Sequence, residues 1–163
     1  LSPSSAASDV YKRQEGTEAV YIDKVESTVS SIRMVSRVGS RIPLYCSGVG
    51  KALLAELPEP EIEDIWNSSE IPPLTPYTVT SLSDLMDRIR GVREAGYALD
   101  DEAHEEGVRC IAVSIPDYHK APVYALSISA PVSRMTDARI AELSTDVLTF
   151  KKDLEKTLGF SRS

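Results

Sequence analysis

Two segments in the second half of the chain place a thiol and several hydroxyl groups at alternating positions. The segments cover residues 107–115 and 122–131. Successive side chains of a strand point to opposite faces of a sheet, so two extended segments would gather small, lightly polar residues on one face. These residues are Cys110, Ala112, Ser114, Ala125, Ser127 and Ser129. Such a face leaves space for a small molecule and offers hydroxyl donors to it; the alternative is a sheet that packs tightly on a helix.

The opposite face of the same two segments is bulky and apolar. It carries Ile111, Val113, Ile115, Tyr124, Leu126 and Ile128. We expect this face to pack on helices. The short, turn-like connection over 116–122 predicts that the two segments form an antiparallel hairpin.

A glycine-containing segment, residues 46–51, could hold a carboxylate. Gly48 and Gly50 stand at the start of a predicted helix, where backbone N–H groups can approach a ligand and the helix dipole adds positive charge. The segment is not a phosphate-binding loop, because Tyr45 and Ala52 stand where that motif needs Gly and Ser or Thr. The alternative is a structural helix capped by its own side chains.

The acidic run over 100–106 offers a second polar group. Asp100, at the edge of a predicted strand, could point into the pocket and accept hydrogen bonds from ligand hydroxyls. A single histidine, His104, among carboxylates is weak evidence for a metal site, and we expect neither a metal nor a cofactor. The other carboxylates are expected in a solvated loop: Asp101, Glu102, Glu105 and Glu106.

The two cysteines, Cys46 and Cys110, are candidate nucleophiles in a hydrolase or amidase. A catalytic thiol needs a nearby base, and neither His104 nor His119 stands in a recognisable protease or amidase motif. We therefore expect that the chain is not an enzyme. Two cysteines are too few for a disulfide framework and their spacing fits no zinc pattern, which favours a reducing, cytoplasmic setting.

Composition limits the partners of this chain. Its 163 residues suit one domain, with 42% hydrophobic and 26% charged residues. The formal net charge of −7 argues against direct binding of nucleic acid, which needs clustered Lys and Arg. No apolar run approaches the length of a membrane span.

The first fourteen residues look foreign to the rest. They lack an amphipathic period and an apolar signal-peptide core, and 9–14 reads like the translated end of a sequencing-library transposon. We expect 1–14 to be a translation artefact or a disordered tail that takes no part in the fold, and 15–163 to form the domain.

The elements that position these groups follow from periodicity and capping signals. Alternation and helical spacing predict strands over 18–26, 30–38, 107–115 and 122–131, an extended segment over 96–100, and helices over about 48–56, 58–66, 81–95 and 137–158. Ser47 and Ser81 are predicted N-caps and Gly96 a C-terminal stop. Strands and helices in this order favour an α+β fold, with an antiparallel sheet flanked by helices.

Four motifs, at 39–55, 96–102, 105–112 and 125–131, resemble in order those of the effector-binding domain of the IclR family of bacterial transcription regulators. The resemblance runs from about Glu18 to Gly159. It implies a GAF- or PAS-like sensor fold with an effector cavity lined by Met34, Ile42, Gly48, Val49, Asp100, Cys110, Ser127 and Ser129. In this family an upstream winged helix-turn-helix domain binds DNA, and no segment of this chain resembles it.

The resemblance therefore predicts a domain that senses a small organic acid, such as a sugar-derived keto acid or an aldonate. The ligand would change the geometry of a dimer or tetramer, and with it the spacing of DNA-binding domains absent from this chain. Two alternatives remain: a cysteine-dependent hydrolase or amidase, and a GAF- or PAS-like dimerisation module without a ligand.

Overall fold

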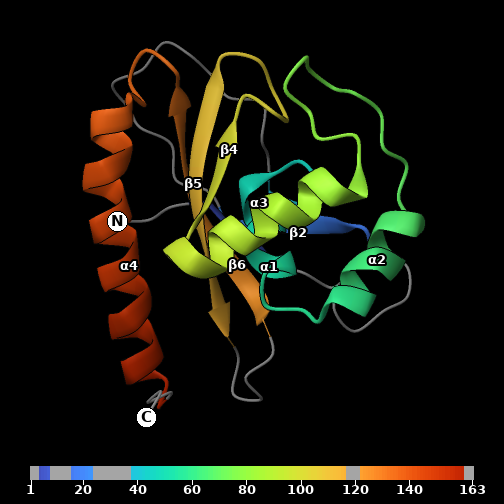
Figure 1. Cartoon of the computed structure of the whole chain (residues 1–163). Coiled ribbons are helices and arrows are strands. Elements are labelled where there is room, and N and C mark those ends of the chain that lie inside the picture. The colour runs from blue at the N-terminus through green and yellow to red at the C-terminus, as the bar shows by residue number, and fades with distance from the viewer. Residues whose placement is uncertain (1–3, 8–15, 24–37, 117–121, 160–163) are drawn as a thin grey trace.

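The structure is a computed structural model that describes residues 4–7, 16–23, 38–116 and 122–159. Along the described chain, three strands are followed by three helices, three further strands and a C-terminal helix (Figure 1). The strands are β1 (Ser4–Ala7), β2 (Glu18–Asp23), β3 (Arg41–Pro43), β4 (Ala98–Asp101), β5 (Val108–Pro116) and β6 (Pro122–Pro131). The helices are α1 (Gly48–Leu54), α2 (Glu59–Asn67), α3 (Leu82–Ala95) and α4 (Asp137–Thr157).

One six-stranded sheet runs in the order β3-β2-β1-β6-β5-β4, and each neighbouring pair is antiparallel. β5 and β6 form the predicted hairpin, with Cys110 opposite Ser129 and Ala112 opposite Ser127. The sheet and its flanking helices confirm the predicted α+β class.

The two faces of the hairpin pack as the alternation predicts. On one side of the sheet lies α4, and on the other lie α1 and α3 (Figure 1). Ile111, Val113 and Leu126 form a buried cluster with apolar residues of α4. Tyr124 shares that face but is exposed, so the helix covers only part of it.

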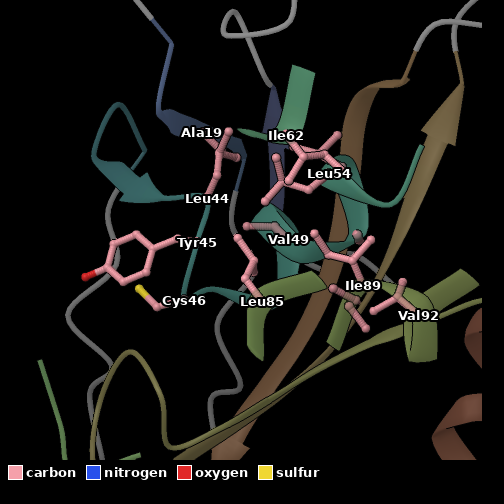
Figure 2. Close-up of a cluster of buried hydrophobic side chains, with 14 of the residues drawn as sticks. Ala19, Leu44, Tyr45, Cys46, Val49, Leu54, Ile62, Leu85, Ile89 and Val92 are labelled. Atoms are coloured by element: carbon pink, nitrogen blue, oxygen red, sulfur yellow. The ribbon is translucent and has the colours of Figure 1, made fainter. Parts of the chain in front are cut away.

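The small-residue face belongs to the larger core. Ala112 and Ala125 are fully buried there, together with residues of α1 and α3. Figure 2 shows members of this core, among them Val49 of α1 and Leu85 and Ile89 of α3. Small side chains in the strands allow the short helix α1 to approach the sheet closely.

Local capping signals place the helix ends. Ser47 caps α1 by accepting a hydrogen bond from the Gly50 N–H, and Ser81 caps α3 by accepting from the Asp84 N–H. Gly96 ends α3 with φ at 83°, a left-handed conformation that glycine adopts without steric cost.

The N-terminal segment differs from expectation. Ser4–Ala7 forms β1 between β2 and β6, whereas we expected 1–14 to stand outside the fold. Hydrogen bonds of a sheet join backbone groups, so an extended segment can occupy a place between two strands without a favourable apolar pattern. The remaining residues of 1–14 lie outside the described residues.

In the first half of the chain, one predicted strand is not described and one observed strand was not predicted. The strand predicted over 30–38 falls, except for Val38, outside the described residues. The short strand β3 occurs where we expected the chain only to leave that strand. Pairing with β2, with Ile42 opposite Ala19, extends β3 where its three residues alone carry no periodic signal.

Candidate functional site

A pocket of about 200 Å³ opens between the start of α1 and the sheet. Seven of the eight predicted site residues line it: Ile42, Gly48, Val49, Asp100, Cys110, Ser127 and Ser129. The eighth, Met34, lies outside the described residues. Residues far apart in sequence thus converge on one concave surface.

The floor of the pocket is the end of the small-residue face near Cys110. The Cys110 Sγ lies 2.8 Å from the Ser129 Oγ across the hairpin. Cys110 and Ser129 are half-buried, whereas Ala112 and Ala125, further along the same face, are fully buried under helices. Both interpretations of this face therefore hold, each for one part: tight packing at the alanines and a pocket wall at the thiol and hydroxyls.

Gly48 and Gly50 have different roles. A side chain on Gly48 would lie within 3.6 Å of the Cβ atoms of Cys110, Ala112 and Asp100, so its absence keeps space open above the floor. Gly50 faces away: a Cβ there would lie 2.2 Å from the Leu44 carbonyl oxygen.

The expectation that the Gly50 N–H serves a ligand is therefore wrong. That group donates to the Ser47 Oγ at 3.1 Å, and the Ser47 hydroxyl donates to the Pro43 carbonyl at 2.5 Å. Gly50 belongs to a capped structural helix, while Gly48 and Val49 line the pocket.

Asp100 is buried, and its carboxylate accepts hydrogen bonds from the backbone of the turn that follows it. Its Oδ1 accepts hydrogen bonds from the Ala103 N–H at 2.8 Å and from the His104 N–H at 3.4 Å. Burial raises the pKa of Asp100, while the charge of Lys51 and the two backbone hydrogen bonds oppose that rise. The carboxylate therefore shapes the following turn as well as the pocket wall.

The turn over residues 101–107 is held by hydrogen bonds at Glu102, where its backbone is strained. Glu102 has φ at 60°, unusual for a residue other than glycine. Its carboxylate accepts from the Gly107 N–H at 2.8 Å, and its carbonyl accepts from the Thr75 hydroxyl at 2.7 Å. Thr78 likewise donates to the Ala103 carbonyl at 2.7 Å. These bonds hold the turn against the pocket.

The acidic run is only partly the solvated loop that we expected. Asp101, Glu105 and Glu106 are exposed, as predicted. Glu102 is half-buried and hydrogen-bonded within the turn, and Glu105 also lines the pocket. The sequence spacing does not show this, because the turn is folded back by threonines from another loop.

Six further residues line the pocket that sequence analysis did not select. They are Tyr21, Ser40, Arg41, His104, Glu105 and Val108. Alternation in β2 places Tyr21 on the face opposite Val20 and Ile22, and burial raises the pKa of its hydroxyl to about 12. Arg41 lies 3.6 Å from the Glu18 carboxylate and is largely exposed.

Neither cysteine has the chemistry of an activated nucleophile. Burial, and the charge of Asp100, raise the pKa of the Cys110 and Cys46 thiols to about 12. Catalytic cysteines need the opposite shift, toward the thiolate. Within the described residues, no group of three or more His, Cys, Asp and Glu side chains could hold a metal ion.

Comparisons with known proteins agree with this geometry. Residues 11–155 match the family described as bacterial transcriptional regulator IclR, C-terminal. The chain belongs to this family. The prediction of a regulator domain that is not an enzyme is thereby confirmed, since relatives of the IclR family are named as repressors.

The chain is 37% identical over 149 residues to the acetate operon repressor of Salmonella typhimurium, covering 91% of this chain and 54% of that protein. The crystal structure of the Thermotoga maritima IclR superposes with a TM-score of 0.84 at 37% identity, over 96% of this chain and 60% of that one. The C-terminal domain of E. coli KdgR gives a TM-score of 0.80 at 33% identity, over 96% and 86% of the two chains.

The chain thus spans about half the length of the curated IclR-family relatives that it matches. Among its described residues, no helix combines the length and apolar character needed to cross a membrane.

Proposed function

We propose that this IclR-family domain senses a small organic acid, such as a keto acid or an aldonate, in the pocket at the start of α1. The observation that carries the proposal is the convergence of Asp100, Cys110, Ser127 and Ser129 on one concave surface. A pocket of about 200 Å³ suits a ligand of few non-hydrogen atoms. The serine hydroxyls would donate to the carboxylate, and Asp100 would accept from ligand hydroxyls.

The signal would be a shift between two arrangements of the domain. A ligand that binds one arrangement about tenfold better biases the equilibrium by only about 1.4 kcal/mol, so several contacts must change together. We propose that the bias acts on a dimer or tetramer of the whole regulator. DNA binding would belong to a separate domain of that regulator, in the cytoplasm, and the acidic charge of this chain is consistent with that division.

The experiment is calorimetric titration after a thermal-shift screen with pyruvate and gluconate as probes. We expect the double variant Ser127→Ala/Ser129→Ala to bind the responding probe about tenfold more weakly, because charge-assisted hydrogen bonds to a carboxylate are lost. Ser133→Ala, at an exposed position beyond β6, is the matched control and should bind like the parent. Equal affinity of the parent and the double variant would remove both serines from the site.

A further inference from the structure

A buried lysine lies beside the pocket without lining it. Lys51 stands one helical turn after Gly48 in α1 and is 4% exposed. Its Nζ donates a hydrogen bond to the carbonyl of Leu99 in β4. The next residue in that strand is Asp100, which lines the pocket.

Burying an ammonium group is costly unless a counter-charge lies close by. Within the described part of the chain, Lys51 has no ion pair inside 4.0 Å, and a backbone carbonyl is its hydrogen-bond acceptor. A neutral donor could fasten α1 to β4 equally well. The choice of a buried lysine at this position therefore points to a use beyond anchoring the strand.

The charges around the pocket indicate what that use is. The lining carries two carboxylates, Asp100 and Glu105, against one guanidinium, Arg41. The Arg41 side chain is 64% exposed and faces Glu18, so its charge is largely screened by solvent and by its partner. Without Lys51, an anion entering this pocket would meet net negative charge.

The groups that act on Lys51 come from several elements. Burial lowers its pKa, and the neighbouring Arg88 of α3 lowers it further. Asp100 of β4, Cys46 before α1 and Cys110 of β5 oppose the shift. Two of these, Asp100 and Cys110, line the pocket, so the field of Lys51 reaches the space where a ligand would lie.

We propose that Lys51 is a specificity-determining residue: its buried ammonium makes the pocket select anions over neutral molecules of the same shape, without contacting them. The proposal deepens the function proposed above and rests on it, since it concerns the same pocket. It assigns the preferred ligand class to small carboxylates whose charge lies near the floor formed by Cys110 and Ser129.

Cys110 provides a probe of the field that requires no knowledge of the natural ligand. Iodoacetate and iodoacetamide have nearly the same size, and each alkylates the same thiolate: the sulfur forms a thioether bond to carbon and iodide leaves. Both rates are proportional to the fraction of Cys110 that is thiolate, so their ratio does not depend on the pKa of Cys110. The ratio reports whether the pocket attracts a carboxylate, and peptide mass spectrometry separates Cys110 from the fully buried Cys46.

We expect Lys51→Met to lower the ratio of the iodoacetate rate to the iodoacetamide rate at Cys110 by about threefold or more, because a unit charge in a protein interior acts strongly on a nearby carboxylate. Lys51→Gln removes the charge but keeps an N–H donor for Leu99, and should lower the ratio equally. Lys152→Met, the same change at an exposed position of α4, should leave the ratio unchanged. If Lys51 only anchors β4, both rates change by one factor and the ratio stays constant, which would overturn the proposal.

The parent protein supplies a second measurement should neither variant fold. Its ratio should fall as pH rises toward 10.5, the ordinary pKa of lysine, because Lys51 loses its proton below that value and the attraction for the carboxylate reagent disappears. A ratio that stays flat over this range would also overturn the proposal. Failure of pyruvate and gluconate to bind, with a ratio that responds as expected, would count against the proposed ligands and leave the role of Lys51 standing.

Discussion

At the scale of single residues, the two glycines of α1 show how identical residue types two positions apart acquire different roles. Gly48 keeps space open above the pocket floor, while Gly50 lets α1 lie against the backbone of Leu44. The sequence predicts both at the start of a helix, and their roles differ only because the Leu44 backbone lies against Gly50 and not against Gly48. The approach is a contact between backbone and backbone, so it cannot be relieved by a change of side-chain rotamer.

We therefore expect Gly50→Ala to lower the free energy of unfolding by about 3 kcal/mol or more, because the added methyl group would overlap the Leu44 backbone. Urea denaturation measures the loss. Gly91→Ala is the matched control: Gly91 lies inside α3 with nothing within 4 Å of an added Cβ, so alanine should stabilise by about 1 kcal/mol. A Gly50→Ala protein as stable as its parent would show that α1 can move away from Leu44 at little cost.

At the scale of elements, α1 and β5 each have one end at the pocket and the other beside α4. Ser114, on the same face of β5 as Cys110, donates to the Glu56 carboxylate at 2.7 Å and accepts from the Lys151 ammonium at 3.0 Å. Lys151 also lies 3.6 Å from Glu56 and 3.9 Å from Glu155. This cluster, beside a groove of about 420 Å³, fastens the C-terminal helix to the far ends of α1 and β5.

We expect Ser114→Ala to destabilise the fold by about 1–2 kcal/mol, since Ser114 is buried and the change removes its hydrogen bonds to the Glu56 carboxylate and the Lys151 ammonium. Thermal or urea unfolding measures the effect, with Ser133→Ala as the exposed control. A double-mutant cycle with Lys151→Met should show coupling of at least about 0.5 kcal/mol. Strict additivity would mean that the two side chains stabilise α4 independently.

At the scale of the whole molecule, buried acids set the stability at alkaline pH. The folded-state pKa values of Cys46 and Cys110 rise from 9.0 to about 12. Their contribution is complete below pH 9 and is lost as pH rises toward 12, because the unfolded chain releases protons that the folded chain still holds. Lys51 acts in the opposite direction. Because its pKa is lowered in the folded chain, its loss of a proton raises the free energy of unfolding as pH rises toward 10.5, and above that value Lys51 no longer changes the pH dependence.

We therefore expect the free energy of unfolding to fall between pH 9 and pH 11.5. The fall should be steepest above pH 10.5, where Tyr21 and Tyr45, whose pKa values are also raised by burial, add to the two thiols and each group contributes up to about 1.4 kcal/mol per pH unit. Urea denaturation at a series of pH values tests this. Cys110→Ala should flatten the slope, since it removes one of the two thiols. A stability that is constant or rises over this interval would contradict the assigned shifts.

The sequence alone predicts those features of the fold whose physical cause lies within a few residues. Ser47, Ser81 and Gly96 mark helix ends through hydrogen bonds and backbone angles within a few residues, and the structure confirms all three. Strand alternation likewise predicted which hairpin residues pack against α4. β1 and β3 were missed because pairing partners distant in sequence extend them.

The amino-acid sequence by itself determined the class of fold, the two faces of the hairpin and the family to which the chain belongs. The first two follow from local hydrogen bonding and from the period of the side chains, and the family follows from the resemblance of four motifs to those of known members. Only the tertiary structure decided that the small-residue face is packed at Ala112 and open at Cys110, that Gly50 serves the helix rather than a ligand, and that Lys51 lies buried against the Leu99 carbonyl. Each of these depends on how closely segments distant in sequence approach one another, and spacing along the chain does not carry that information.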